Sequence, residues 1–185
     1  MLLRNGYNSK TERNIRMRLH RDFYSRDVLE VAPDLLGKAL VRRFDDGKIL
    51  RLTINDVEAY RGEEDLGCHA SKGRTPRTDV MYHQGGRVYV YLIYGMYWML
   101  NFTTGREDHP QAVLIRGSVE IEGPGRIGRA LKLDKSFYGE DLSTSERIWV
   151  ENHVNSDKIE IMTSPRVGID YAGEHWAGKH WRFRY

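Results

Sequence analysis

The sequence predicts a single α+β domain built on a curved, mainly antiparallel β-sheet with short helices around it. Strand-like segments are joined by short turns such as Asp45-Asp46-Gly47 and Gly95-Met96, whereas parallel strands would need long crossovers. Helix-like segments are scattered between the strand pairs and do not alternate with single strands. At 185 residues the chain is large enough for one domain with its own core.

The predicted elements begin with a short helix near residue 27. Asp27 can cap this helix with Glu30 as its capping-box partner, Pro33 is expected to open a second turn, and Gly37 to close it. A second helix is predicted from Gly123-Pro124 to Leu131, with proline in the first turn. Strands are predicted at 38–44, 49–60, 87–94, 97–103, 112–120, 148–151 and 158–162.

Basic residues gather in two places. Residues 1–18 are expected to form a basic, flexible leader, and residues 19–185 the folded domain. A loop of roughly twenty residues after Tyr60 carries Arg74 and Arg77, and loops of this length tend to be functional. The net charge of +3 permits nucleic-acid binding but does not require it. Both basic segments could equally be solvated surface.

Several protein classes are excluded. A single cysteine, Cys68, rules out an internal disulfide framework. The N-terminus shows no secretory signal, and the most apolar run, 88–102, is too short and too rich in tyrosine to span a bilayer. We therefore expect a protein that is not secreted and has no membrane partner: cytoplasmic and nucleoid-associated in a bacterium, nuclear in a eukaryote.

A tyrosine-rich hairpin is the first candidate for function. Strand alternation places Tyr89 and Tyr91 on one face, and Tyr94 falls near the hairpin tip with Met96 beside it. An aromatic side chain at a tip has little core to pack against, and proteins that distort duplex DNA insert such wedges between base steps. The alternative is a half-buried aromatic sheet face without further function.

The segment Asp56-Val57-Glu58-Ala59-Tyr60 is the second candidate. On a strand, Asp56, Glu58 and Tyr60 share a face, so a carboxylate beside an aromatic ring could act as a general base next to a flat ligand. An ordinary surface carboxylate is the alternative. Glu58, Cys68, His69 and His83 match no zinc spacing, so no metal is expected.

The order of these motifs resembles the alkyladenine (3-methyladenine) DNA glycosylase family, over about residue 19 to the C-terminus. The matching residues are Val57-Glu58-Ala59-Tyr60, His69, Arg74-Thr75-Pro76-Arg77, the hairpin from Tyr89 to Tyr97 with Asn101, Ala112-Val113-Leu114-Ile115-Arg116, Gly123-Pro124, Lys135-Ser136-Phe137 and Arg166-Val167-Gly168-Ile169. The chain departs from the family in three places: a short segment after Glu120, Arg126 where lysine is more usual, and Asp56 where some relatives have glutamate.

The resemblance implies a role for each matching residue. Glu58 would be the base that activates water, with Arg116 and the backbone carbonyl of Val167 holding that water. Tyr60 and Tyr91 would stack on the extruded base. The remaining implied roles are hydrogen bonding to the base for His69, discrimination against guanine for Asn101, insertion into the duplex and its minor groove for Tyr94, Met96 and Tyr97, and backbone contacts for Arg74 and Arg77.

The implied activity is that of a monofunctional DNA glycosylase. It would flip alkylated purines, with deaminated purines as a further class, out of duplex DNA and hydrolyse the N-glycosidic bond, initiating base excision repair. No pocket lysine marks a strand-cleaving nucleophile, and no cofactor is implied. A monomer acting on duplex DNA with damaged purines is expected. Two alternatives stay open: a non-catalytic nucleic-acid-binding module, and a hydrolase of free nucleosides.

Overall fold

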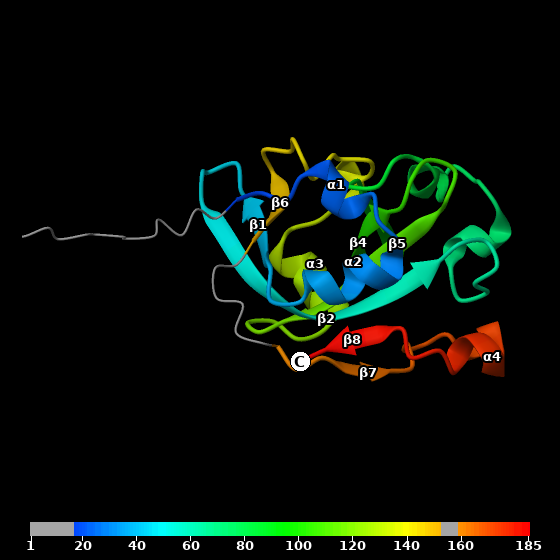
Figure 1. Cartoon of the computed structure of the whole chain (residues 1–185). Coiled ribbons are helices and arrows are strands. Elements are labelled where there is room, and N and C mark those ends of the chain that lie inside the picture. Colours follow the sequence, from blue (N-terminus) through cyan, green and yellow to red (C-terminus); the bar gives the residue numbers. More distant parts are fainter. Residues whose placement is uncertain (1–16, 153–158) are drawn as a thin grey trace, which may run out of the picture.

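The strand β2 (Ile49–Arg61) organises the sheet (Figure 1). Its first half pairs with β1 (Ala39–Arg43), and its second half pairs with β5 (Gln111–Ser118) and β8 (Arg182–Arg184). In the computed structural model, which describes residues 17–152 and 159–185, every strand pair is antiparallel, and the sheet order is β3-β4-β5-β2-β1-β6. The sheet curls into a half barrel, so the predicted fold class is confirmed.

The chain enters this sheet through two short helices. The predicted leader lies outside the described residues except for Met17 and Arg18, and Arg18 forms a β-bridge with Glu151. Helix α1 (Arg21–Tyr24) was not predicted. Helix α2 (Val28–Leu35) begins where expected, because the Asp27 carboxylate accepts a hydrogen bond from the Leu29 N–H at 2.9 Å.

Pro33 does not open a second turn, contrary to expectation. It lies inside α2, two residues before the helix ends at Leu35. A proline this close to a C-terminus removes one N–H but leaves few following residues for its ring to disturb. The Leu36 N–H then bonds to the Pro33 carbonyl at 3.2 Å, which tightens the last turn.

The tyrosine hairpin forms the edge of the sheet next to β5. Strands β3 (Val88–Ile93) and β4 (Tyr97–Thr104) pair directly, and β4 continues the sheet onto β5. The strand predicted to reach residue 120 ends at Ser118, because Ser118 and Ile121 close a tight turn with backbone hydrogen bonds in both directions. This short connection brings α3 (Pro124–Ala130) directly against β4.

The C-terminal segment supplies two strands. The predicted strand at 148–151 is observed as β6 (Ile148–Glu151), which pairs with β1. The strand predicted at 158–162 is instead β7 (Met162–Ser164), and Lys158 lies outside the described residues. Helix α4 (Glu174–Ala177) and strand β8 were not predicted, and Figure 1 shows them on the side of β2 opposite α2.

The two faces of the sheet serve different purposes. One face packs on α2 and α3 to form the main hydrophobic core, which includes Val57, Val90, Leu100 and Ile115. The opposite face of β3, β4 and β5 carries a second cluster with the long loop, whose 3₁₀ helices are η1 (His69–Lys72) and η2 (Asp79–Tyr82). This second face holds the candidate site. Within the described ranges no helix is both long and apolar enough to cross a membrane.

Candidate active site

A β-bulge in β2 turns Glu58 toward this second face. Leu52 and Ile54 point into the main core, and strict alternation would place Glu58 there as well. The pairing of β2 with β5 shifts register around Asp56, so Val57 faces the core next and Glu58 faces the opposite side. Asp56, Glu58 and Tyr60 therefore share a face, as the sequence predicted.

Strand register then aligns two predicted site residues, Glu58 and Asn101, in one row with Tyr89 and Leu114. Tyr89 pairs with Asn101, Asn101 pairs with Leu114, and Leu114 pairs with Glu58. The row runs across β3, β4, β5 and β2. Tyr89, Asn101 and Leu114 line one cavity, and Glu58 is buried beside Leu114. The Asn101 side-chain N–H donates to the Tyr89 carbonyl at 3.0 Å, which fixes the orientation of this buried amide.

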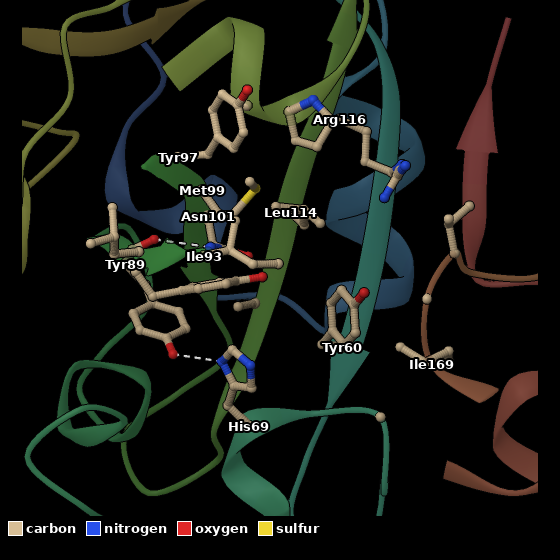
Figure 2. A pocket seen from close by; sticks show the side chains of 18 of the residues that line it. Tyr60, His69, Tyr89, Ile93, Tyr97, Met99, Asn101, Leu114, Arg116 and Ile169 are labelled. Atoms are coloured by element: carbon tan, nitrogen blue, oxygen red, sulfur yellow. Dashed lines mark hydrogen bonds between the residues drawn. The ribbon is translucent and has the colours of Figure 1, made fainter. Parts of the chain in front are cut away.

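The cavity has a volume of about 610 Å³, within the range of pockets that bind small ligands. Figure 2 shows Tyr60, His69, Asn101 and Arg116 around it, with Tyr97 toward α3 and Ile169 contributed by the C-terminal segment. The predicted site residues that line this cavity are Tyr60, His69, Arg77, Tyr91, Tyr94, Tyr97, Asn101, Arg116 and Val167.

Glu58 lies at the centre of the polar contacts and is fully buried. Its Oε1 accepts a hydrogen bond from the Val167 N–H at 2.8 Å and lies 3.3 Å from Arg116 Nη1. Its Oε2 accepts from the Tyr60 hydroxyl at 2.8 Å. A carboxylate offers about four acceptor positions. Two hydrogen bonds and the ion pair with Arg116 occupy three of them and leave one position on Oε2. The contact from Val167 to Glu58 is made by its backbone amide.

Asp56 and Arg182 form a bidentate ion pair beside Glu58. Arg182 Nε and Nη2 lie 2.9 and 2.6 Å from the two Asp56 oxygens, and Arg116 Nε lies 4.0 Å from Asp56 Oδ2. Arg116 thus stands between two carboxylates, which holds its guanidinium against the cavity wall. Asp56, at which this chain departs from some relatives, is therefore the ion-pair partner of Arg182.

His69 is neutral in this site. Burial first, and then the nearby Arg77 guanidinium, lower the pKa of His69 to about 4. Arg77 Nη2 lies 3.4 Å from His69 Nε2, so Nε2 is the acceptor, and Nδ1 then donates to the Tyr89 hydroxyl at 2.7 Å. The imidazole is thereby fixed in one tautomer, with its ring edge against Tyr91 at 4.6 Å between centroids.

The tyrosine walls stay protonated. Burial first, and then the charge of Glu58, raise the pKa of Tyr60 well above its ordinary value, which keeps its hydroxyl a donor to Glu58. Burial likewise raises the pKa of Tyr91 to about 12. Both rings line the cavity and present neutral aromatic surface to a flat ligand.

The hairpin tip is strained and exposed. Tyr94 has a φ of 52°, followed by Gly95 at 67°, and such turns favour Asn-Gly over Tyr-Gly. Tyr94 is 82% exposed and Met96 63%, so neither packs in a core. Tyr97 lies below the tip, half-buried, against Gly125 of α3 and beneath the Arg129 guanidinium.

The two arginines of the long loop differ in their surroundings. Arg74 pairs with Asp79 at 2.8 Å and with Asp108 at 3.4 Å. Arg77 lies over the Tyr91 ring at 5.0 Å, lines the cavity, and has no carboxylate partner within residues 17–152 and 159–185. The charge of Arg74 is therefore neutralised by two carboxylates. The charge of Arg77, which lies at the cavity mouth, is not neutralised by any carboxylate of the described residues.

Sequence reasoning missed several residues of the site. Asp65, Tyr171 and Arg182 carry no local motif, and most of their partners are far away in the sequence. Arg166 and Tyr89 belong to segments that the motif order singled out, but neither was given a role there. Among the described residues no group of three or more His, Cys, Asp or Glu side chains is arranged to hold a metal.

A fully buried carboxylate hydrogen-bonded to the wall of a tyrosine-lined cavity, next to an exposed aromatic tip, is an arrangement that suits acid–base chemistry. Comparison with known families specifies the class further. The sequence model described as Methylpurine-DNA glycosylase (MPG) matches residues 22–122 and 118–185. The chain belongs to this family, which confirms the resemblance drawn from its motifs.

Curated relatives agree with this assignment. Three of them carry the name "Putative 3-methyladenine DNA glycosylase". The protein from Methanocella arvoryzae is 44% identical over 176 residues, covering 84% of this chain and 86% of the relative. The one from Natranaerobius thermophilus is 41% identical, covering 86% and 91%. The one from Legionella pneumophila strain Corby is 43% identical, covering 90% and 93%.

Proposed function

We propose that this DNA glycosylase flips alkylated purines out of duplex DNA and hydrolyses their N-glycosidic bond with a water activated by Glu58. Deaminated purines are proposed as a further substrate class. The observation that carries the proposal is the fully buried Glu58 carboxylate, which is hydrogen-bonded to Tyr60 and Val167 of the cavity wall and keeps one acceptor position on Oε2. Family membership supports the excision of alkylated bases.

The remaining position on Oε2 suits a water proton. Val167, Tyr60 and Arg116 fill the other positions, so the carboxylate cannot rotate without losing hydrogen bonds. Glu58 would take one proton from the water as the oxygen attacks C1′ of the sugar. The C1′–N bond breaks, its electron pair passes to the base, and the base leaves.

A single carboxylate suffices for an alkylated purine. Ordinary glycosidases use a second carboxyl group to protonate the leaving group. A purine alkylated at N3 or N7 is already cationic, so it leaves as a neutral base without that proton. Neutral His69, whose Nε2 accepts a hydrogen bond from Arg77, is a polar partner for the base and not a general acid.

The tyrosine walls supply selectivity for the same substrate. A cationic purine between Tyr60 and Tyr91 gains cation–π attraction. An undamaged purine, which is neutral, gains less. Asn101, held by the Tyr89 carbonyl, is proposed to disfavour the exocyclic amino group of guanine. Tyr94 is proposed to fill the vacated stack, with Met96 beside it, which offsets the few kcal/mol that flipping costs.

Replacing Glu58 with glutamine tests this function. Glu58→Gln keeps the shape of the side chain but removes the base, so single-turnover excision of 3-methyladenine or hypoxanthine from a duplex should fall about 10²–10⁴-fold. Affinity for the lesion duplex should stay within a few-fold. Glu30→Gln, an exposed carboxylate on α2 away from the cavity, is the matched control. Excision by Glu58→Gln at the control's rate would rule out Glu58 as the base.

A further inference from the structure

A buried ion pair that the proposed chemistry does not use lies directly behind Glu58. Arg166 and Asp65 both have fully buried side chains. The two guanidinium nitrogens of Arg166 lie 2.5 and 2.8 Å from the two Asp65 oxygens. Such a pair is costly to bury and adds little stability over apolar residues of similar size. Its presence beside the cavity calls for another role.

Asp65 ties this pair to the start of the long loop. Besides the two bonds from Arg166, its carboxylate accepts hydrogen bonds from the Arg61 N–H at 3.1 Å and the Gly67 N–H at 3.0 Å. All four acceptor positions of the carboxylate are therefore filled. Arg166 is thus held by the Asp65 carboxylate, which cannot rotate without losing hydrogen bonds.

Arg166 in turn fixes three parts of the Glu58 environment. Its Nη1 donates to the Ala59 carbonyl at 3.0 Å, and Ala59 is the residue between Glu58 and Tyr60. Its guanidinium lies 4.8 Å from the centre of the Tyr60 ring and 5.0 Å from that of Trp181, so it is sandwiched between them. The next residue, Val167, donates its N–H to Glu58.

We infer that Arg166 and Asp65 are positioning residues that hold Glu58 in its reactive orientation through Ala59, Tyr60 and Val167. The pair joins the end of β2 to the C-terminal segment at one point, 101 residues apart in sequence. Both hydrogen-bond donors to Glu58, the Tyr60 hydroxyl and the Val167 amide, are placed by Arg166. This inference rests on the proposed function of Glu58.

Arg166→Lys is the decisive variant. Lysine keeps the positive charge for Asp65 but loses the fork of donors and the flat surface against Tyr60. At saturating enzyme, the single-turnover excision rate should fall at least about tenfold, while lesion-duplex affinity should stay within about threefold. A rate equal to that of the wild type would overturn the inference.

The pH dependence gives a readout that a purely structural role would not move. Hydrogen bonds donated to a carboxylate favour its ionised form. The groups that face Glu58 are Asp56, Tyr60, Tyr91, Arg116 and Arg182, and only the Tyr60 and Val167 donors depend on Arg166. The acid limb of the excision rate should therefore move to higher pH in Arg166→Lys. An acid limb at the wild-type pH would contradict the inference.

Two further variants separate positioning from stability. Arg147→Lys is the chemical match, because Arg147 lies 4.1 Å over the Phe137 ring and pairs with Glu140 outside the cavity. It should lower the melting temperature without changing the excision rate of the folded enzyme. The double variant Asp65→Asn/Arg166→Met removes the buried charges, keeps an acceptor oxygen for the loop N–H groups, and should keep the fold yet lose excision. Wild-type excision by the folded double variant would overturn the inference.

The amide proton of Val167 tests the positioning without any reaction. Its NMR resonance should lie downfield in the wild type, because it donates to a carboxylate, and should move upfield in Arg166→Lys. An unchanged resonance would overturn the inference. A wild-type chain that excises no damaged base would refute the proposed function, whereas wild-type excision that Arg166→Lys preserves would refute the positioning role alone.

Discussion

The protonation of His69 depends on its neighbours and not on its residue type. An exposed histidine titrates near pH 6.5, but burial beside the Arg77 guanidinium lowers the pKa of His69 to about 4. Its two ring nitrogens are then committed to different partners, Arg77 and the Tyr89 hydroxyl. A neutral imidazole adds no further positive charge to a cavity that Arg77 and Arg116 already line.

This low pKa predicts a pH-dependent loss of stability. The folded state binds fewer protons than the unfolded state between about pH 4 and 6.5, so stability should fall as the pH decreases through that window. Between pH 7.5 and pH 5, His69 alone should lower the free energy of unfolding by about 2 kcal/mol. In urea unfolding, His69→Gln should therefore lose less free energy of unfolding than the wild type when the pH changes from 7.5 to 5.

The control for this measurement is His180→Gln, which removes an exposed histidine outside the cavity. Its loss of stability between pH 7.5 and pH 5 should match that of the wild type. If His69→Gln also matched the wild type, His69 would titrate normally and its assignment as a neutral group would fail.

Single residues of the site were predictable only where a motif carried them. The family motif supplied Glu58, and the structure adds that a bulge at Asp56 is what turns it out of the core. Local sequence could not show this, because a bulge is set by the pairing with β5. Asp65 was out of reach for a similar reason, and Arg166 was named in a motif without its role, because each needs a partner about a hundred residues away.

Among the elements, the hairpin of β3 and β4 shows a conflict between local preference and sequence. Its turn needs positive φ, which glycine or asparagine adopts with least strain, yet Tyr94 occupies the first such position. Strain at an exposed, unpacked aromatic residue stabilises neither the turn nor the core. This supports the proposed insertion of Tyr94 into DNA.

Tyr94→Ala tests that insertion. Stacking of a base on an aromatic ring contributes roughly 1–3 kcal/mol, which corresponds to about five- to 150-fold in the flipping equilibrium. Single-turnover excision from duplex DNA should fall by a factor in this range. Excision from the same lesion in a single strand should barely change, since no gap in a stack needs filling.

Tyr94→Asn is the matched control for the turn, because asparagine suits the positive φ but cannot stack on bases. It should lose duplex excision like Tyr94→Ala while keeping or raising the melting temperature. Equal losses on duplex and single strand would favour a general nucleic-acid binder, and no loss on either would favour a nucleoside hydrolase.

Elements with strong periodicity and clear turn residues were predictable, and the C-terminal ones were not. The hairpin, α3 and β6 lie close to their predicted positions. Strand β8 has only three residues, and its pairing with Asp56–Glu58 comes from tertiary contact. Helix α4 spans four residues, below the length at which an apolar repeat can be recognised.

At the scale of the whole molecule, the net charge of +3 says little about where DNA would bind. The position of unbalanced charge is more informative. Sequence treated Arg74 and Arg77 alike, but the fold gives Arg74 two carboxylate partners and gives Arg77 a place at the cavity mouth. A guanidinium already balanced by Asp79 and Asp108 has less charge to offer a phosphate.

The salt dependence of duplex binding should therefore separate the two arginines. Each phosphate neutralised by a cation contributes about 0.9 to the slope of log affinity against log salt. Arg77→Gln should reduce the slope by about that amount, whereas Arg74→Gln should change it by less than half as much. Binding of an uncleaved lesion duplex to the Glu58→Gln background, measured between about 50 and 200 mM salt, gives both slopes without turnover. Equal reductions by the two variants would mean that DNA displaces Asp79 and Asp108 from Arg74. No reduction by Arg77→Gln would place the phosphate contact elsewhere on the surface.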